Sequence, residues 1–280
     1  GNDGDVELDL DDVELEVDGS GGPFRLEARG GKAEITALGS GGEIRLEETP
    51  ATLSGCQGDL DIESDAEIAL RNNKASIHVM GYGASLRGFA HEGLLEIVTR
   101  AADVILENVQ GPVRVQGDGL HVSMQEIGGE VYVATTSSNI NLRRMRAAVT
   151  VDNDYGDVTM GEVDGKIAVT NRDGNVVLEE LKTEVEVEAD GDDVRVSWAS
   201  LDSNAGPSTI RNAGGGVSVV LPPNGGCTLR ATSRFGRIES ELADVIVSDD
   251  GSSAEGSVNR RSRPVVVVES EGPVQLATGN

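Results

Sequence analysis

A nine-residue spacing of apolar residues runs through the middle of the chain and constrains its fold more than any other feature. From Ile68 to Val194, every ninth residue is Val, Ile or Leu. The residues two positions further on, from Leu70 to Val196, are apolar as well, with Gly88 as the exception. Because residues i and i+2 share one face of a β-strand, each nine-residue unit is predicted to be a short strand followed by a tight turn.

The turns between these strands are of two alternating kinds. One kind carries an apolar residue and recurs at intervals of eighteen residues, at Val109, Ile127, Met145, Val163 and Leu181. The other kind is polar, as in residues 152–156 and 170–174, and is rich in Asn, Asp and Gly, which tolerate left-handed backbone angles. The alternation predicts a coil of eighteen residues with two strands, one apolar edge and one edge that faces water. A coil of twice that length is the alternative that the spacing leaves open.

These coils predict an all-β fold, a parallel β-solenoid in which like residues stack about 4.8 Å apart. A single coil cannot bury its apolar face, so stacking of coils forms the core. We expect one continuous domain with irregular N-terminal coils and a cap in 1–67, a regular core in 68–196, and irregular C-terminal coils and a cap in 197–280. Loops are expected at 48–58 and 248–263.

Charge and composition exclude several classes of partner and site. The 280 residues include 49 acidic and 23 basic ones, for a net charge of −26. Such a chain repels phosphate groups, so neither nucleic acid nor an anionic membrane surface is an expected partner. No apolar run is long enough for a membrane span, and two distant cysteines exclude a disulfide scaffold. Because the chain begins Gly-Asn-Asp without Met, we expect that a signal peptide has been removed.

Several short segments with glycine-led turns resemble a known family over roughly residues 95–245. They are Gly156–Met160, Gly165–Thr170, Gly174–Leu178, Gly216–Pro222, Thr228–Ser233 and Gly236–Ile238. The chain in this part is similar to a bacterial and archaeal adhesin family of cell-envelope β-solenoid domains of unknown function. The resemblance implies an extracellular or cell-envelope location and a binding or structural role, and it brings no catalytic residues. The acidic N-terminal stretch departs from the family pattern.

Acidic residues of the polar turns form a candidate calcium site. They are Asp152, Asp154, Asp157, Asp173, Asp190 and Asp192. Stacked coils would hold these carboxylates about 4.8 Å apart, where they repel one another and calcium could bridge them. The alternative is that they cap their own turns and face water, since the Gly-Gly-x-Gly-x-Asp repeat of calcium-binding rolls is absent. No other cofactor is expected.

The sequence gives no sign of catalytic chemistry. His78, His91 and His121 have no zinc-like spacing, and we expect all three to be exposed. Polysaccharide lyases and hydrolases also use β-helices, but they need grooves with carboxylate pairs and aromatic platforms for sugar rings. Aromatic residues are 2% of the chain, with Trp198 and Tyr155 as the candidates for a platform. We therefore predict no enzyme, and a carbohydrate-active solenoid enzyme or polysaccharide-binding module is the alternative.

The two ends of the chain carry opposite charges and strand-like alternation. Residues 1–18 contain nine acids and no base. Their apolar positions are Val6, Leu8, Leu10, Val13, Leu15 and Val17, and the other end carries Arg260, Arg261 and Arg263 before a strand with Val265 and Val267 inward. Open strand edges pair with other chains, and opposite charges steer such pairing.

From these ends we expect head-to-tail self-assembly by strand addition into filaments, or binding to cell-surface and extracellular-matrix components. The alternative is that each terminal segment folds over its own end as a cap.

Overall fold

The structure is a computed structural model that describes residues 6–259 and 263–279. Every regular element in these ranges is a β-strand, which confirms the predicted all-β class. Accordingly, the described residues contain no helix long and apolar enough to cross a membrane. The chain forms two compact units, unit 1 (residues 1–137) and unit 2 (residues 138–280).

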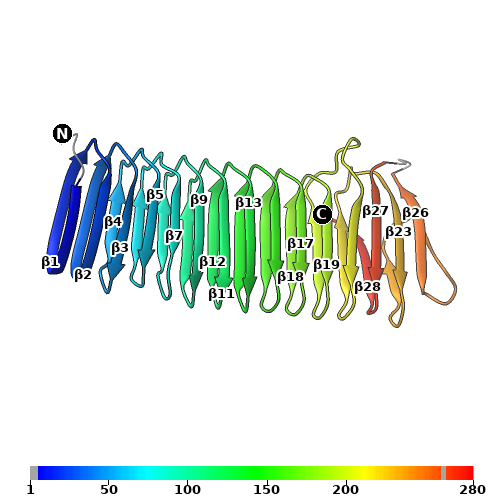
Figure 1. Cartoon of the computed structure of the whole chain (residues 1–280). Coiled ribbons are helices and arrows are strands. Elements are labelled where there is room, and N and C mark those ends of the chain that lie inside the picture. The colour runs from blue at the N-terminus through cyan, green and yellow to red at the C-terminus, as the bar shows by residue number, and fades with distance from the viewer. Residues whose placement is uncertain (1–5, 260–262, 280) are drawn as a thin grey trace. The chain divides into compact units, whose positions relative to one another are not determined.

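Unit 1 is a stack of parallel strands, coloured blue to green in Figure 1. The strands are β1 (Val6–Ser20), β2 (Phe24–Leu38), β3 (Gly42–Glu47), β4 (Ala51–Ser54), β5 (Leu60–Ser64), β6 (Ile68–Arg71), β7 (Ile77–Met80), β8 (Leu86–Phe89), β9 (Leu95–Arg100), β10 (Asp103–Glu107), β11 (Val113–Asp118), β12 (His121–Ile127) and β13 (Val131–Thr136). From β3 to β11, each strand pairs in parallel with the strand two places further along the chain, so that two rows of strands form.

The pairing register of unit 1 confirms a coil of about eighteen residues. Val113 lies opposite Val131, eighteen residues away. The same offset holds at the N-terminus, where the long strand β1 runs beside β2 with Val6 opposite Phe24. Segment 48–58, expected as a loop, contains β4, whose Ala51 lies opposite Ile68. The offset at this coil is seventeen residues instead of eighteen, so the nine-residue spacing did not predict β4.

Inward residues of successive coils form the core of unit 1, and the apolar turn residues close one of its edges. Ile97, Val115 and Val133 are stacked inward residues and are fully buried. The turn residues Val109 and Ile127 are fully buried too, as predicted. Stacking thus removes from water an apolar face that one coil alone would expose, which is the main favourable term in folding.

Unit 2 continues the same design and then changes its order. Its strands are β14 (Asn139–Met145), β15 (Val149–Asn153), β16 (Val158–Val163), β17 (Ile167–Asn171), β18 (Val176–Leu181), β19 (Val185–Ala189), β20 (Val194–Trp198), β21 (Ser208–Asn212), β22 (Val217–Leu221), β23 (Cys227–Ser233), β24 (Ile238–Ser240), β25 (Val245–Val247), β26 (Ser253–Val258), β27 (Val265–Ser270) and β28 (Val274–Thr278). Val149 lies opposite Ile167, and Val158 opposite Val176, each at an offset of eighteen residues. An insertion after β20 raises the offset to 23 residues, so Val187 lies opposite Ile210.

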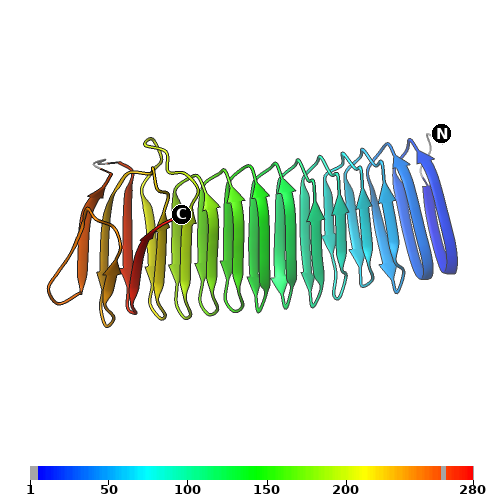
Figure 2. The same ribbon diagram turned by 180° about the vertical axis from the view of Figure 1, so that it is seen from behind.

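The last strands of the chain lie inside unit 2 rather than at its end. β27 pairs in parallel with both β21 and β23, and β28 pairs with both β22 and β24. In Figures 1 and 2 the red C-terminal strands accordingly lie between yellow and orange strands. Beyond them, β26 pairs antiparallel with β23 and with the short β25. The parallel ladder of unit 2 is thus followed by antiparallel strands.

Two expectations for this region are wrong. Segment 248–263 was expected to be a loop, but it contains β26, whose Ser-rich sequence lacks an apolar alternation. The inward residues of β27 are Val266 and Val268, both fully buried, whereas Val265 and Val267 are half-buried on the outer face. Four consecutive valines show no alternation of apolar and polar residues. Which two of them face inward is therefore set only by pairing with the neighbouring strands.

The polar edge of the coil is not entirely exposed to water, contrary to expectation. Asn153 and Asn171 lie opposite each other and are buried, with exposed fractions of 0% and 1%. The Asn153 side-chain amide donates to Asn171 Oδ1 at 3.1 Å, and Asn171 Nδ2 donates to the carbonyl oxygens of Gly156 and Gly174, both at 3.1 Å. These bonds satisfy turn carbonyls that water cannot reach.

We predict that Asn171→Ala destabilises the protein by about 1–3 kcal/mol, because it leaves buried polar groups of two coils without partners. Thr159→Ala, at an exposed outward position of β16, is the matched control and should change stability by less than about 0.5 kcal/mol. Urea unfolding of both variants measures this. Equal stability of the two variants would show that the buried amide ladder contributes nothing.

Candidate functional site

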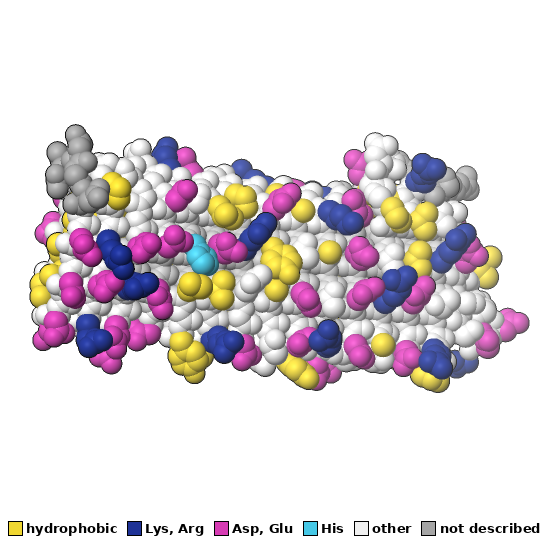
Figure 3. Space-filling model, viewed as in Figure 1, with side chains coloured by type: hydrophobic (Ala, Val, Ile, Leu, Met, Phe, Trp, Pro, Cys, Tyr) yellow, Lys and Arg dark blue, Asp and Glu magenta, His cyan; other side chains and the backbone are white. Residues whose placement is uncertain are grey.

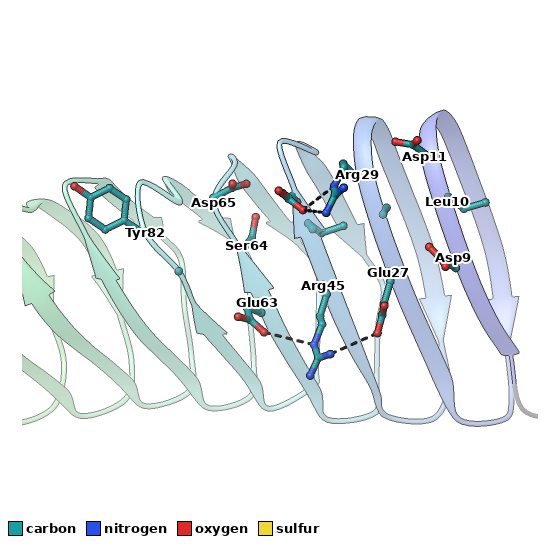
Figure 4. Close-up of a pocket in the computed structure, with 14 residues that line it drawn as sticks. Asp9, Leu10, Asp11, Glu27, Arg29, Arg45, Glu63, Ser64, Asp65 and Tyr82 are labelled. Atoms are coloured by element: carbon teal, nitrogen blue, oxygen red, sulfur yellow. Dashed lines mark hydrogen bonds and ion pairs between the residues drawn. The ribbon is translucent and has the colours of Figure 1, made fainter.

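A groove on unit 1 has a volume of about 920 Å³. Residues of β1, β2, β3 and β5 and of the turns after β5 and β7 line it, as the close-up in Figure 4 shows. The wider face in Figure 3 carries acidic and basic side chains intermixed, with scattered apolar ones. The groove therefore combines a strongly charged floor with an open side.

Charged residues of the groove are arranged in rows that follow the strand register. Arg45 lies opposite Glu27 of β2 and Glu63 of β5. Its Nη1 and Nε atoms lie 3.5 Å from Glu27 Oε1 and from Glu63 Oε2 respectively, so one guanidinium bridges two coils (Figure 4). Because all three side chains are largely exposed, this row contributes little to stability.

A second row follows one step along the same strands. Arg29 lies opposite Asp11 and Glu47, and its Nη2 is 2.6 Å from Glu47 Oε2. The hydrogen bond to Glu47 raises the pKa of Arg29 above its ordinary value, and the charge of Asp11 adds to this effect. The carboxylates of Glu27, Glu47 and Glu63 are thus engaged by arginine instead of meeting each other as an acid pair.

Tyr82 closes the groove beside Asp65 and Gly81 and is 70% exposed. An exposed ring beside hydrogen-bonding side chains is a surface on which a sugar ring can stack. Sequence reasoning missed Tyr82, because it lies in a turn of the repeat and only the alignment of several coils places it at a groove. Of the two aromatic residues that were considered, Trp198 is buried and donates from Nε1 to Thr183 O at 2.9 Å, while Tyr155 is exposed at a turn of unit 2.

The predicted N-terminal assembly residues all lie on β1 and point toward the interior of the first coil. Val6, Leu8, Leu10, Leu15 and Val17 are half-buried, and Val13 is 42% exposed. Equivalent residues of β2, such as Leu26 and Ile35, are fully buried. β1 pairs with β2 and with no other strand of the described residues. Its outer edge is therefore open within the part of the chain that the structure describes.

The predicted C-terminal assembly residues have a different setting. Arg260 and Arg261 lie outside the described residues, and Arg263 is exposed just before β27. Val265 and Val267 lie on β27, which is already paired on both sides. A strand with two partners offers no edge to a third, so these valines do not supply the open edge that the sequence suggested.

The acidic turn residues lie on unit 2, and several have partners of their own. Asp154 forms an ion pair with Arg172 of the next coil, and Asp157 accepts hydrogen bonds from Asn175 N at 2.9 Å and Asn175 Nδ2 at 3.1 Å. Asp152, Asp173, Asp190 and Asp192 are exposed. Within the described ranges, no three His, Cys, Asp or Glu side chains gather as a metal site would require. Calcium binding stays a prediction of the sequence.

The histidines divide into two kinds. His121 is exposed as expected, and His78 is partly exposed with its Nδ1 3.5 Å from Asp61 Oδ1. His91 was expected to be exposed, but it is fully buried, and neither ring nitrogen has a hydrogen-bond partner. It lies eighteen residues before the turn residue Val109, and its backbone oxygen accepts from Gln110 N at 2.7 Å. Extending the apolar-turn spacing backward by one step would have placed it in the interior.

Burial lowers the pKa of His91 below its ordinary value. The unfolded chain therefore takes up a proton near pH 6.5 that the folded protein resists. Stability is full above this pH and falls as the pH drops through it, because the unfolded state then binds more protons.

We predict that the free energy of unfolding decreases between pH 7.5 and 5.5, by at most about 1.4 kcal/mol per pH unit. His91→Leu keeps a similar volume in the interior and should remove most of this dependence, whereas His121→Gln should not. Denaturant unfolding across this range measures it. An unchanged pH dependence in His91→Leu would contradict the assignment.

Comparison with known proteins identifies a family. The family model Toastrack DUF4097 matches residues 130–277, more than half of the chain. Searches of curated proteins and of solved structures gave no match. The β-solenoid resemblance noted from the sequence agrees with this finding, while the adhesin designation is not part of the family description. The chain belongs to the Toastrack DUF4097 family.

Proposed function

We propose that this protein is a non-enzymatic structural protein of the cell envelope or the extracellular space, which binds other chains along the open edge of β1. The observation that carries the proposal is the contrast between β1 and β2. Both strands have fifteen residues, yet the inward side chains of β1 are half-exposed while most of those of β2 are buried. β1 turns back at Asp12, which has a φ of 50°, so it presents two open strand edges, Val6–Asp11 and Val13–Ser20. An open strand edge with an apolar inner face pairs readily with another chain.

The repeat itself supports a structural role. In the regular coils each turn of the chain adds two strands to the ladder, and outward positions such as Arg45, Glu27 and Glu63 form charged rows across neighbouring coils. Such a scaffold presents a repeated surface, and repeated coils are a common way of building extended binding surfaces.

The groove beside Tyr82 favours a second candidate function, binding of a polysaccharide. Tyr82 offers a platform, and the exposed carboxylate of Asp65 lies on the same side of the groove. We expect Tyr82→Ala to abolish retention on any polysaccharide gel that retards the native chain, while Tyr155→Ala, the matched exposed tyrosine on unit 2, should not. Equal retardation of both variants would place the sugar elsewhere.

The location can be tested with the cysteine chemistry of the chain. Cys56 and Cys227 are buried, and burial raises the pKa of both thiols, that of Cys227 to about 11. Both are therefore poor targets for maleimides. We predict that Thr159→Cys, at an exposed outward site of β16, is labelled in intact producing cells by a membrane-impermeant maleimide.

The native chain is the control and should stay unlabelled in the same cells. Labelling of Thr159→Cys only after cell lysis would overturn the proposed location. Mass spectrometry of the purified chain gives the readout and shows which cysteine has reacted.

A further inference from the structure

The outward side chains of β1 are uniformly acidic. They are Glu7, Asp9, Asp11, Asp12, Glu14, Glu16 and Asp18. None of these carboxylates forms an ion pair with another described residue, although most of the arginines and lysines of the neighbouring coils do so. The outward face of β1 is a surface of concentrated negative charge.

The charges on β2 and β3 show which residues lie beside an acidic residue in this part of the ladder. Along one row, Asp11 is followed by Arg29 and then Glu47, so sign alternates from coil to coil. Lys32 likewise lies opposite Glu14, and Arg25 opposite Glu7, whereas Asp9 lies opposite Glu27 and Glu16 opposite Glu34. Opposite charges side by side stabilise strand pairing, and like charges oppose it. Continuing the alternation outward from Glu7, Asp11 and Glu14 requires a basic residue next to each of them.

The backbone of β1 has free groups on the same side. Val6 N donates to Pro23 O at 3.0 Å, toward the second coil. Alternate residues of a strand direct their backbone groups to opposite sides. The N–H groups of Glu7 and Asp9 therefore face away from β2, where no described strand accepts them. An added strand would find hydrogen-bonding groups and a half-exposed apolar row together.

The charge pattern also decides against two occupants. A second copy of β1 would place acid against acid. The described C-terminal end of unit 2 finishes with β25, which has three residues, and with the antiparallel β26, whose outward Glu255 is acidic. Neither offers a long strand with basic outward residues.

Building on the proposed function, we propose that the outer edge of β1 binds an extended strand in which apolar residues alternate with Lys or Arg. The apolar residues cover Val6, Leu8 and Leu10 on the first leg of β1, before its turn at Asp12, and the basic ones meet Glu7, Asp9 and Asp11. The partner is a polypeptide of this chemistry and is not a second copy of the chain.

Two synthetic peptides of equal length test this with the full chain. One alternates Val with Lys and the other Val with Glu, and fluorescence anisotropy measures binding of each. The Val–Lys peptide should bind more than about tenfold more tightly than the Val–Glu peptide, and its affinity should fall with added salt as ion pairs are screened. Equal binding of the two peptides, or binding of the Val–Lys peptide that ignores salt, would overturn the proposal.

A pair of variants separates strand addition from simple charge attraction. Asp9→Asn and Asp9→Pro remove the same charge, but only Asp9→Pro also removes the N–H that faces the open edge, and an edge strand tolerates proline there. We expect Asp9→Asn to weaken the Val–Lys peptide severalfold and Asp9→Pro to abolish its binding. Equal binding by the two variants would show that no strand is added.

A measurement on the native chain does not depend on these variants folding. Addition of the Val–Lys peptide should slow amide hydrogen exchange at Glu7 and Asp9, since both N–H groups then donate to the peptide. Unchanged exchange at saturating peptide would contradict the proposal. Dimers of the chain that Asp9→Pro dissociates would identify a second copy as the occupant and also overturn it. The peptide experiments and the maleimide labelling are independent of each other. The former test strand addition at β1, and the latter tests the proposed location of the protein.

Discussion

The structure depends on one constraint, the stacking of each inward side chain on its equivalent from the next coil. Parallel pairing at a fixed offset brings Val104 over Val122 in unit 1 and Val158 over Val176 in unit 2. The same pairing aligns backbone groups for hydrogen bonding and removes the apolar row from water. Because both effects need the same register, a slip by one residue would lose both at once.

In a stack of this kind the first and the last strand each have one edge without a neighbouring strand. In unit 2 the chain places β27 and β28 among earlier strands and adds antiparallel strands beyond β23. In unit 1, β1 repeats the length and register of β2 without a described strand outside it. The two ends of the ladders thus differ in chemistry as well as in topology, and the proposal of binding at the β1 edge rests on this difference.

The repeat made the fold predictable, and departures from it set the limits. The fixed spacing identified the coil, the inward residues of the core and the buried turn residues Val109 and Ile127 correctly. Asn171 was assigned to a polar turn, but its burial depends on bonds to the neighbouring coil that no single turn reveals. The strand order of β27 rests on pairing between residues far apart in the chain, which local pattern does not encode. Of the candidate sites, the acidic alternation of β1 was visible in the sequence, whereas the Tyr82 groove needed the lateral alignment of several coils.

The central claim is that residues eighteen apart are lateral neighbours. Thr159 and Val177 lie opposite each other on β16 and β18 and face outward. The most direct measurement is cross-linking of the double variant Thr159→Cys/Val177→Cys with a short thiol-specific reagent. The control is the double variant Thr150→Cys/Thr159→Cys, whose sites are nine residues apart and lie on the consecutive strands β15 and β16. Stacked coils predict rapid cross-linking of the first pair and little of the second, because adjacent strands lie about 4.8 Å apart. Cross-linking of the second pair alone would contradict the account.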